Sequence, residues 1–210
     1  MPEPQHAPGA GPVVTIFESY GAGAQEVGPR VAEALGVAFH AQAFSSEQLE
    51  NPGADGGLLS RVLAAMGGSY AALEGPAVAM AQRDDHELVL RNTREVLAAA
   101  RPGAVIVGRN GALILAAWPQ ALHVRLDAPA ALRVERAARA GGITRDRAAR
   151  RQRREDDLRA DMSLRLYGWD PREPTRYDLV LNTGTLSPDT CAGIIVQAAR
   201  MKAARSASPA

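Results

Sequence analysis

The chain has 210 residues, of which 46% are hydrophobic, so it can bury a sizeable core in one large domain or two small ones. Its 24 basic and 23 acidic side chains leave a formal net charge of +1, which argues against a surface that coats nucleic acid. All the basic residues except Lys202 are arginines, which excludes a mechanism that needs a lysine in the body of the chain.

Short β-branched runs alternate along the chain with longer helical patterns. The expected strands are Val13–Phe17, Val37–His40, Ala104–Gly108, Ala121–Leu126 and Asp178–Thr183. The expected helices are about Ala24–Leu35, Asp84–Ala100, Pro129–Ala140 and Pro188–Met201, the last with Ser187 as its cap. Continuous apolar runs of this length suit strands that are covered on both faces. The alternation therefore predicts an α/β fold with a doubly wound parallel sheet.

Two stretches fit the alternation less well. Within Phe44–Gln82, the segment Leu58–Met66 has a helical pattern, but glycine-rich breaks surround it. Ile143–Tyr167 is rich in arginine and poor in apolar residues, so we expect helical structure that stands off the core. No boundary divides the chain, which predicts a single domain over residues 13–203 between a disordered leader, 1–12, and a disordered tail, 204–210.

Nothing in the sequence predicts a membrane protein. The longest apolar stretch, Ala112–Trp118, is far shorter than the roughly 18–20 residues that span a bilayer, and the first residues lack the apolar region of a secretory signal. The single Cys191 excludes an intrachain disulfide, and the four histidines lack metal-site spacing. We therefore expect a cytoplasmic protein with no membrane partner and no metal-ligating residues.

The first predicted strand ends in a glycine-rich turn within Ser19–Gly28. Ligands of parallel sheets bind beyond the carboxyl ends of the strands, where such a turn presents backbone N–H groups and a helix dipole to an anion. The literal motifs fail, because a dinucleotide fingerprint needs glycine in place of Glu26 and a Walker A motif needs Lys and Ser or Thr in place of Pro29 and Arg30. The turn alone supports a phosphate site and a close helix–strand contact equally.

A second strand end carries Gly108-Arg109-Asn110. The arginine projects from the carboxyl edge of the sheet, on the same side as the first turn, and its planar fork suits a phosphate or a base edge. The alternative is an arginine that packs over the sheet and pairs with a carboxylate. The position favours a ligand.

A third group of arginines runs from Arg133 to Arg159. Arg133 and Arg136 share a helix face at i, i+3. The mixture of Arg145–Arg154 with later acidic residues is typical of a solvated helix with internal ion pairs, and it lacks the aromatic residues that a nucleic-acid-binding arm uses for stacking. A mobile lid over a phosphate site is the third alternative, and it agrees best with the other two groups.

The order of these blocks resembles the cytidylate kinase-like family, whose members are relatives of nucleoside monophosphate kinases within the P-loop superfamily. The blocks are VVTIFESYGAGAQEVGPRVAEALGVAFH, AVIVGRNGALIL, LDAPAALRVERAARAGGITRDRA, EDDLRA and YGWDPREPTRYDLVLNTGTLSP. Together they cover about Val13 to Ala199, and several blocks in the right order are more specific than any one of them.

The resemblance implies a P-loop, nucleoside monophosphate kinase-like fold with an arginine-rich lid at about 141–168, and ATP and Mg2+ as cofactors. Six residues of the first turn would wrap the ATP phosphates: Gly21, Ala22, Gly23, Ala24, Gln25 and Glu26. The catalytic residues would be Arg109, Arg133 and Arg159, and the acceptor would contact Arg109, Asn110 and Asp156. Phosphoryl transfer needs mainly positioning and charge neutralisation, which arginines can supply.

The chain departs from the family's pattern at the first turn. Phe17 and Glu18 stand where the family often has a Ser-Arg pair. Gln25 stands where ordinary nucleoside monophosphate kinases have the P-loop lysine and where members of this family tend to carry an arginine. Gln25 offers hydrogen bonds but no charge, and Asn110 replaces an aspartate of true cytidylate kinases. The loss of a cation beside the phosphates removes several kcal/mol of electrostatic stabilisation, which Arg30 or an arginine of the lid would have to replace.

These observations favour an ATP-dependent phosphotransferase that moves the γ-phosphoryl group of ATP to a (d)CMP-like acceptor, so that its partner is a small-molecule nucleotide. The alternative from another class is a catalytically silent nucleotide-binding module of the same fold, which Gln25 favours. A nucleic-acid-associated protein that uses Arg145–Arg154 is a weaker third hypothesis, and nucleic acid is not the expected partner. The sequence leaves the acceptor, the metal ligands and the oligomeric state open.

Overall fold

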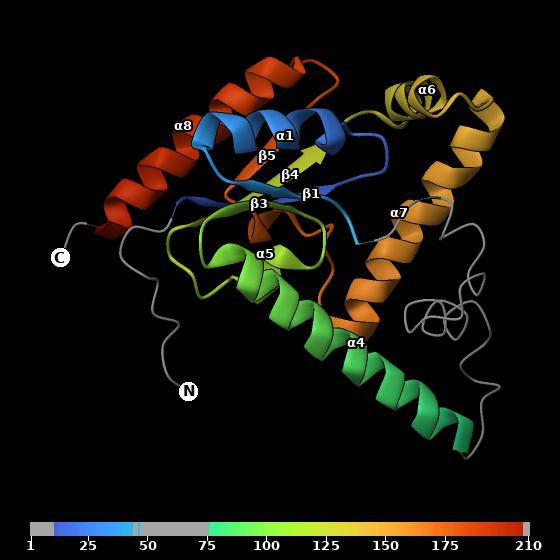
Figure 1. Cartoon of the computed structure of the whole chain (residues 1–210). Coiled ribbons are helices and arrows are strands. Elements are labelled where there is room, and N and C mark those ends of the chain that lie inside the picture. The colour runs from blue at the N-terminus through green and yellow to red at the C-terminus, as the bar shows by residue number, and fades with distance from the viewer. Residues whose placement is uncertain (1–10, 44–45, 47–75, 208–210) are drawn as a thin grey trace.

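The computed structural model describes residues 11–43, 46 and 76–207. These residues contain a five-stranded parallel sheet with the strand order β2-β3-β1-β4-β5. The strands are β1 (Val13–Glu18), β2 (Ala38–His40), β3 (Ala104–Val107), β4 (Ala121–Asp127) and β5 (Leu179–Asn182). The predicted α/β fold with a doubly wound parallel sheet is confirmed, because helices cover both faces of the sheet (Figure 1).

The helices form two layers and a projecting arm (Figure 1). Helices α1 and α8 lie on one face of the sheet, α4 and α5 lie on the other, and α6 leads into α7 beside the sheet. Their bounds are α1 (Ala24–Leu35), α4 (Pro76–Ala100), α5 (Gly111–Ile114), α6 (Ala130–Gly141), α7 (Arg145–Tyr167) and α8 (Pro188–Ala207), with a short 3-10 helix η2 (Pro174–Arg176) before β5.

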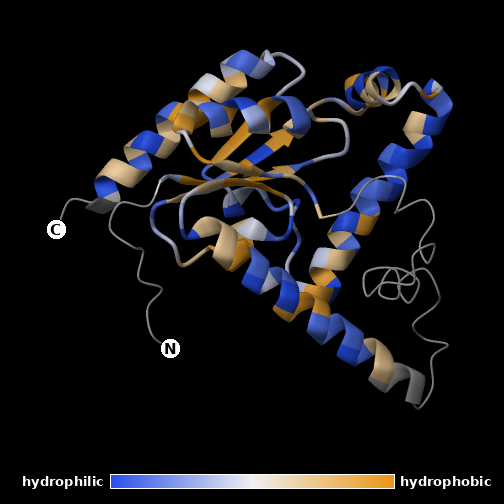
Figure 2. Ribbon diagram, viewed as in Figure 1, coloured by the Kyte–Doolittle hydropathy of each residue, from blue (hydrophilic) through white to orange (hydrophobic). Residues whose placement is uncertain are grey.

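Alternate side chains of β1 reach the two helical layers, as the period of two in a strand requires. Val14 and Ile16 lie in one apolar cluster with Ile195 of α8, whereas Val13 lies in the other with Val96 of α4. All five are at most 1% exposed, and burying a side chain of this size contributes about 1.5–3 kcal/mol. Figure 2 shows the strands among the most hydrophobic parts of the chain, which is why the sheet sits at the centre.

Two helices are longer than the sequence pattern predicts. Helix α4 begins at Pro76 rather than Asp84, and α8 continues to Ala207 rather than ending at Met201, so the first part of the predicted tail is helical. Both extensions are rich in alanine, which favours helix without adding the apolar periodicity on which the prediction relied. The helix predicted for Leu58–Met66 lies outside the described residues.

The end of the predicted leader is tied to the sheet. The Gly11 N–H donates to the Pro102 carbonyl at 3.0 Å, and the Ala104 N–H donates to the Pro12 carbonyl at 3.1 Å. Gly11 and Pro12 are therefore hydrogen-bonded to the segment that leads into β3, while residues 1–10 lie outside the described part of the chain.

Helix α7 confirms the helical structure predicted for the arginine-rich stretch. Thr144 caps it by accepting a hydrogen bond from the Arg147 N–H at 3.3 Å, and the helix runs beside the sheet rather than over either face (Figure 1). Its first half is hydrophilic (Figure 2), and Arg165 near its end forms a forked ion pair with Asp85 of α4 at 2.8 Å. Among the described residues, no helix is long and apolar enough to cross a bilayer.

His123 of β4 is a buried titratable group within the sheet. Its Nδ1 lies 2.8 Å from the Thr15 hydroxyl of β1, and its backbone N–H donates to the Asp178 carboxylate at 2.8 Å. Burial lowers the pKa of the His123 ring, and the neighbouring Asp178 opposes that shift only in part, while Lys202 adds to it. Burial therefore favours the neutral form of the ring in the folded protein.

This histidine predicts a loss of stability as the pH falls. In the unfolded chain its pKa returns to about 6.5, so below that pH the unfolded state binds the extra proton and the free energy of unfolding decreases until the lower folded pKa is reached. Urea denaturation at several pH values between 7.5 and 5 measures the slope. His123→Gln should flatten it, whereas the exposed control His86→Gln should not. Equal slopes in the two variants would contradict the prediction.

Candidate functional site

Three loops meet at one edge of the sheet because β1 lies between β3 and β4. Parallel strands end at the same edge, so the loops that follow Glu18, Val107 and Asp127 become neighbours. These are the loops that carry the glycine turn, the Arg109 segment and the start of α6. The edge is therefore the place where the residues that sequence analysis selected can act together.

The glycine turn has a left-handed backbone at two positions. Gly21 has φ 77° and Gly23, the N-cap of α1, has φ 94°. The Gly23 carbonyl accepts hydrogen bonds from the Glu26 and Val27 N–H groups, both at 3.0 Å, which starts the helix. A side chain at Gly21 would meet the Arg133 carbonyl of α6 at 2.5 Å, so this glycine is needed for a close approach of two backbones.

Gly21→Ala is expected to lower the free energy of unfolding by about 2–4 kcal/mol, because the new Cβ clashes with the Arg133 carbonyl and alanine is also strained in the left-handed conformation. Gly142→Ala is the matched control, since Gly142 is also left-handed at φ 59° but a Cβ there has nothing within 4 Å. That control should cost about 1 kcal/mol. Chemical denaturation of both variants measures the difference, and equal losses would refute the close-approach role of Gly21.

Glu18, the last residue of β1, lies against the N-terminus of α1. Its Oε2 accepts the Ala24 N–H at 2.8 Å, its Oε1 accepts the Gln42 side-chain amide at 3.1 Å, and the Gly23 N–H is a further backbone donor. The residue is only 7% exposed. Burial raises the pKa of the Glu18 carboxyl, and the positive charge of Arg159 opposes this shift in part.

A cavity of about 550 Å³ opens over the turn. Four of the six turn residues that were predicted to hold ATP phosphates line it, namely Gly21, Gly23, Gln25 and Glu26. The other two, Ala22 and Ala24, are fully buried in the apolar cluster beneath the turn and do not line the cavity. The six residues thus form one turn with an open side and a side that is packed against the core.

Three arginines line the same cavity from the opposite side: Arg136 of α6 and Arg151 and Arg159 of α7. Arg136 lies directly over the turn, since its Nη1 donates to the Gly21 carbonyl at 3.3 Å and its Nη2 to the Thr183 carbonyl at 3.0 Å. Sequence analysis noted Arg136 only as a neighbour of Arg133 on a helix face. Its distance to the turn depends on how α6 packs, which local spacing does not reveal.

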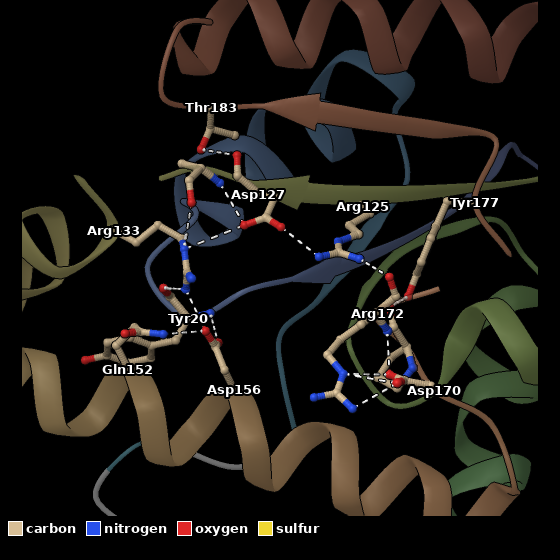
Figure 3. Close-up of polar contacts among 12 residues, drawn as sticks. Tyr20, Arg125, Asp127, Arg133, Gln152, Asp156, Asp170, Arg172, Tyr177 and Thr183 are labelled. Carbon is tan, nitrogen blue, oxygen red and sulfur yellow. Dashed lines mark hydrogen bonds and ion pairs between the residues drawn. The ribbon is translucent and has the colours of Figure 1, made fainter. Parts of the chain in front are cut away.

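Arg133 and Asp156 join α6, α7 and the glycine turn in one partly buried network (Figure 3). Arg133 Nη1 donates to the Asp156 carboxylate at 2.8 Å and to the Tyr20 carbonyl at 2.9 Å. Asp156 in turn accepts the Tyr20 N–H at 2.7 Å and the Gln152 amide at 2.8 Å. The backbone N–H and the carbonyl of Tyr20 are therefore both hydrogen-bonded to this pair. The residues that attach α7 to the turn are ones that were predicted to be catalytic or acceptor-binding.

Asp127, at the end of β4, is neutralised by two arginines (Figure 3). Its carboxylate accepts Arg125 Nη2 at 2.7 Å, lies 3.6 Å from Arg133 Nε, and also accepts the Ala128 N–H at 2.8 Å. Arg125 continues the network to the Arg172 carbonyl. The Asp127 carboxylate therefore holds the start of α6 against the end of β4. Among the described residues, no group of three His, Cys, Asp or Glu side chains could hold a metal ion.

Arg159 of α7 lines the cavity over the turn. Its Nη2 donates to Glu155 at 2.7 Å and to the Gln42 side-chain oxygen at 3.1 Å, and the side chain is 11% exposed. Its Nε and Nη1 are buried and have no hydrogen-bond partner among the described residues. A buried guanidinium with two open donors beside a cavity is a group that an anion would satisfy.

Arg109 and Asn110 lie on the other side of the edge with left-handed backbones, φ 55° and 53°. Arg109 pairs with Glu95 of α4 at 2.9 Å and lines a second cavity of about 240 Å³, together with Arg91 and Asn110. Two consecutive non-glycine residues in this region cost about 1–3 kcal/mol each, and such strain persists where function needs it. The Asn110 side chain is fixed by the Trp169 indole N–H at 2.8 Å.

A third, small cavity of about 70 Å³ shares lining residues with each of the two larger ones. Glu18 and Arg159 line it and also line the cavity over the turn, while Asn110 lines it and also the Arg109 cavity. Arg159 therefore stands where the two sides of the site approach each other. Glu18 and Gln42 complete this junction. Sequence analysis noted Glu18 only as a departure from the family's pattern and did not select Gln42, which follows β2 outside any motif.

Lys202, the single lysine of the chain, lies far from these cavities. It pairs at 2.6 Å with Asp178, which directly precedes β5 at the opposite edge of the sheet from the glycine turn. The positive charge at the site therefore comes from arginines, as the composition implies.

A parallel sheet of this order is shared by solved structures of low sequence identity. The solved structures that it resembles include an uncharacterized protein from Eubacterium ventriosum, with a TM-score of 0.60, 17% identity and coverage of 90% of this chain and 98% of that one. They also include shikimate kinase from Acinetobacter baumannii, with a TM-score of 0.50, 16% identity and coverage of 92% and 95%. At these identities the likeness shows the fold alone. Residues 13–185 match the model of the cytidylate kinase-like family, and the chain belongs to that family.

Curated relatives match about half of the chain. A uronate isomerase from Corynebacterium glutamicum is 38% identical over 111 residues, which are 53% of this chain and 21% of that protein. A cytidylate kinase from Pyrococcus furiosus is 35% identical over 105 residues, 49% of this chain and 52% of the relative. A cytidylate kinase from Ignicoccus hospitalis is 32% identical over 105 residues, 50% and 61% of the two chains. The chain thus spans less than two thirds of each of these relatives.

Proposed function

We propose that the chain binds ATP in the cavity over the glycine turn and transfers its γ-phosphoryl group to a (d)CMP-like acceptor held on the Arg109 side. The observation that carries this proposal is Arg159, whose two open, buried donors lie where the two cavities approach each other. A transferring phosphoryl group passes between two such subsites and spreads negative charge over its oxygens. A dry guanidinium at that point stabilises the charge more than it would in water.

The residues of the turn would act as the phosphate cradle. Gly21 and Gly23 bring backbone close to the cavity, and Gln25 would add a neutral hydrogen bond where a cation is common in the family. Arg136, directly over the turn, supplies a charge that Gln25 lacks. In this arrangement the Gln25 amide would supply the hydrogen bond, and Arg136 of α6 the positive charge, that a single P-loop lysine usually supplies.

The acceptor side would be held by Arg109 and Asn110. Arg109 is partly exposed and its partner Glu95 is exposed, so a phosphate or carboxylate on the acceptor can replace Glu95 as the ligand of the guanidinium. Asn110 offers an amide rather than the carboxylate of true cytidylate kinases, so it can donate to an acceptor as well as accept from it.

Mg2+ would neutralise the nucleotide phosphates when it is bound. The described residues offer no carboxylate cluster for it, so its ligands would be mainly phosphate oxygens and water. We also propose a cytoplasmic location, which agrees with the single buried Cys191 and the nucleotide chemistry of the family.

A second candidate is a catalytically silent nucleotide-binding module of the same fold. Two observations favour it: Gln25 brings no charge to the turn, and the Glu18 carboxylate lies against the N–H groups that would meet a phosphate. A module of this kind would bind ATP without turning it over.

The test is an assay of ADP formation beside ligand-induced shifts of Tm, with ATP, Mg2+ and a panel of acceptors. The panel contains the common nucleoside monophosphates and deoxynucleoside monophosphates, with shikimate and a uronate added because of the names of the similar proteins. Turnover with CMP or dCMP alone supports the proposal. Turnover with another acceptor instead supports phosphoryl transfer but contradicts the proposed (d)CMP-like acceptor. A Tm shift with ATP but no turnover supports the silent module, in which case Gln25→Lys should restore measurable transfer.

A further inference from the structure

The anion site at the start of α1 already holds an anion of the protein itself. A helix N-terminus with a preceding glycine turn attracts negative charge, because its first N–H groups lack partners within the helix and the dipole adds a positive potential. Here the Ala24 N–H, the first of the helix, donates to Glu18 Oε2 at 2.8 Å, and the Gly23 N–H contributes as well. The carboxylate takes the donors that the proposed phosphate site would use.

The position of Glu18 is fixed by the fold and not by a flexible surface chain. It is the last residue of β1, it is 7% exposed, and its second oxygen is held by Gln42 at 3.1 Å. The N-cap residue of α1 is Gly23, which has no side chain, so Glu18 caps the helix from the strand. The same carboxylate lines the cavity over the turn.

We propose that Glu18 is a built-in occupant of the phosphate site, and that a phosphate group binds at the turn only after the Glu18 carboxylate has been displaced or protonated. The inference rests on the proposed function in one respect, since it concerns the same cavity. It adds a regulatory contact: in the state described here the protein is inhibited by its own side chain.

The charges around Glu18 show how the contact would be released. Arg159 of α7 faces it as a cation, while Asp156 and Glu155 of the same helix face it as acids, and Gln42 after β2 is its neutral partner. When the carboxylate leaves, Arg159 loses an opposing charge and keeps two open donors, Nε and Nη1. An incoming phosphate then finds both the amides of the turn and the guanidinium.

Acid should favour release. Burial raises the pKa of Glu18, with Arg159 opposing and Asp156 assisting the shift, so the group becomes neutral at a higher pH than an exposed glutamate. A neutral side chain repels no phosphate and accepts the Ala24 N–H less strongly. Anion binding at the turn should therefore strengthen as the pH falls, and this dependence should disappear when the carboxyl group is removed.

The probe is tripolyphosphate, which presents the anion without a base or a sugar, and its Kd is measured by calorimetry at pH 7.5 and 5.5. We expect Glu18→Gln to bind at least about 10-fold tighter than the native chain at pH 7.5, because the amide keeps an acceptor for Ala24 but carries no charge. Glu18→Ala, which leaves the donors open, should bind tighter still. Glu33→Gln, an exposed acid at the far end of α1, is the control and should match the native chain.

The outcomes separate this inference from the proposed function. Equal Kd values for the native chain and the two folded Glu18 variants overturn it, as does weak binding in all of them. Tighter binding in Glu18→Gln alone, with circular dichroism showing that Glu18→Ala is unfolded, still supports it, since the amide variant is nearly isosteric. If the variants gain tripolyphosphate binding but no acceptor gives turnover, the internal occupant stands and phosphotransfer fails. If the native chain turns over an acceptor and Glu18→Gln has the same KM for ATP, the proposed function stands and the role of Glu18 as an internal occupant is rejected.

Discussion

Arg109→Ala should lower kcat/KM for phosphoryl transfer by at least about 100-fold and leave the fold intact. The native guanidinium lines the second cavity, and its removal deprives the acceptor of a forked donor, an effect typically worth about 3–4 kcal/mol in a catalytic site. The expected cost in stability is small, because the partner Glu95 is about half exposed and returns to water. Alanine also replaces one left-handed L-residue by another, so backbone strain is nearly unchanged.

The measurement is steady-state kinetics with the acceptor that the panel identifies, beside a denaturation curve. Arg139→Ala is the matched control, since Arg139 lies on α6 with a 79% exposed side chain and only a weak i, i+4 partner. If the native chain turns over no acceptor, the readout becomes the Kd of CMP, which should rise by a similar factor. Native rates or a native Kd in Arg109→Ala would remove this residue from the site.

Arg133→Met is expected to cost about 3–5 kcal/mol of unfolding free energy, because it leaves the Asp156 carboxylate without its buried partner. The Arg133 side chain is 9% exposed, and it also donates to the Ala128 and Tyr20 carbonyls, so two backbone acceptors lose their donors as well. The expected result is a large loss of stability that precedes any effect on catalysis. This would mark Arg133 as a positioning residue for α7 and the glycine turn.

Urea denaturation of Arg133→Met, Asp156→Asn and the double variant measures the coupling between the two side chains. We expect the double variant to be more stable than the sum of the single losses implies, by at least about 1 kcal/mol. Arg139→Met should lose less than about 0.5 kcal/mol. Additive losses of stability in the cycle would mean that the pairing of Arg133 with Asp156 does not hold α7 in place. An Arg133→Met variant that is stable but inactive would instead support the catalytic role that the sequence predicts for Arg133.

The layout of the fold could be predicted because it depends on local patterns. The buried runs that form β1, β3 and β4 need no knowledge of distant residues, and their predicted bounds agree with the structure to within about a residue. Ser187 caps the last helix as expected, since its hydroxyl accepts the Thr190 N–H at 3.1 Å, and α8 begins at Pro188. Turns and caps of this kind are short-range chemistry.

The site could be predicted only as a set of positions. The glycine turn, Arg109 and Arg159 were selected because each follows a strand or matches a spacing, and the structure brings them to one edge. The contacts that define their state join distant segments: Glu18 meets Arg159 through Gln42, and Arg133 meets Asp156 across the Tyr20 peptide. An acid at a strand end carries no signal that a turn will fold back onto it, so the occupant of the turn was found only in three dimensions.

The position of Lys202 has a practical consequence for chemical labelling. Nucleotide analogues that carry an amine-reactive acyl group mark a kinase by acylating a lysine beside the phosphates, and here the single lysine side chain pairs with Asp178 at the far edge of the sheet. Such reagents would find no lysine to acylate at the glycine turn of this chain. The same amine is a natural point for attaching a dye or a surface, because coupling there leaves the glycine turn and the arginines untouched.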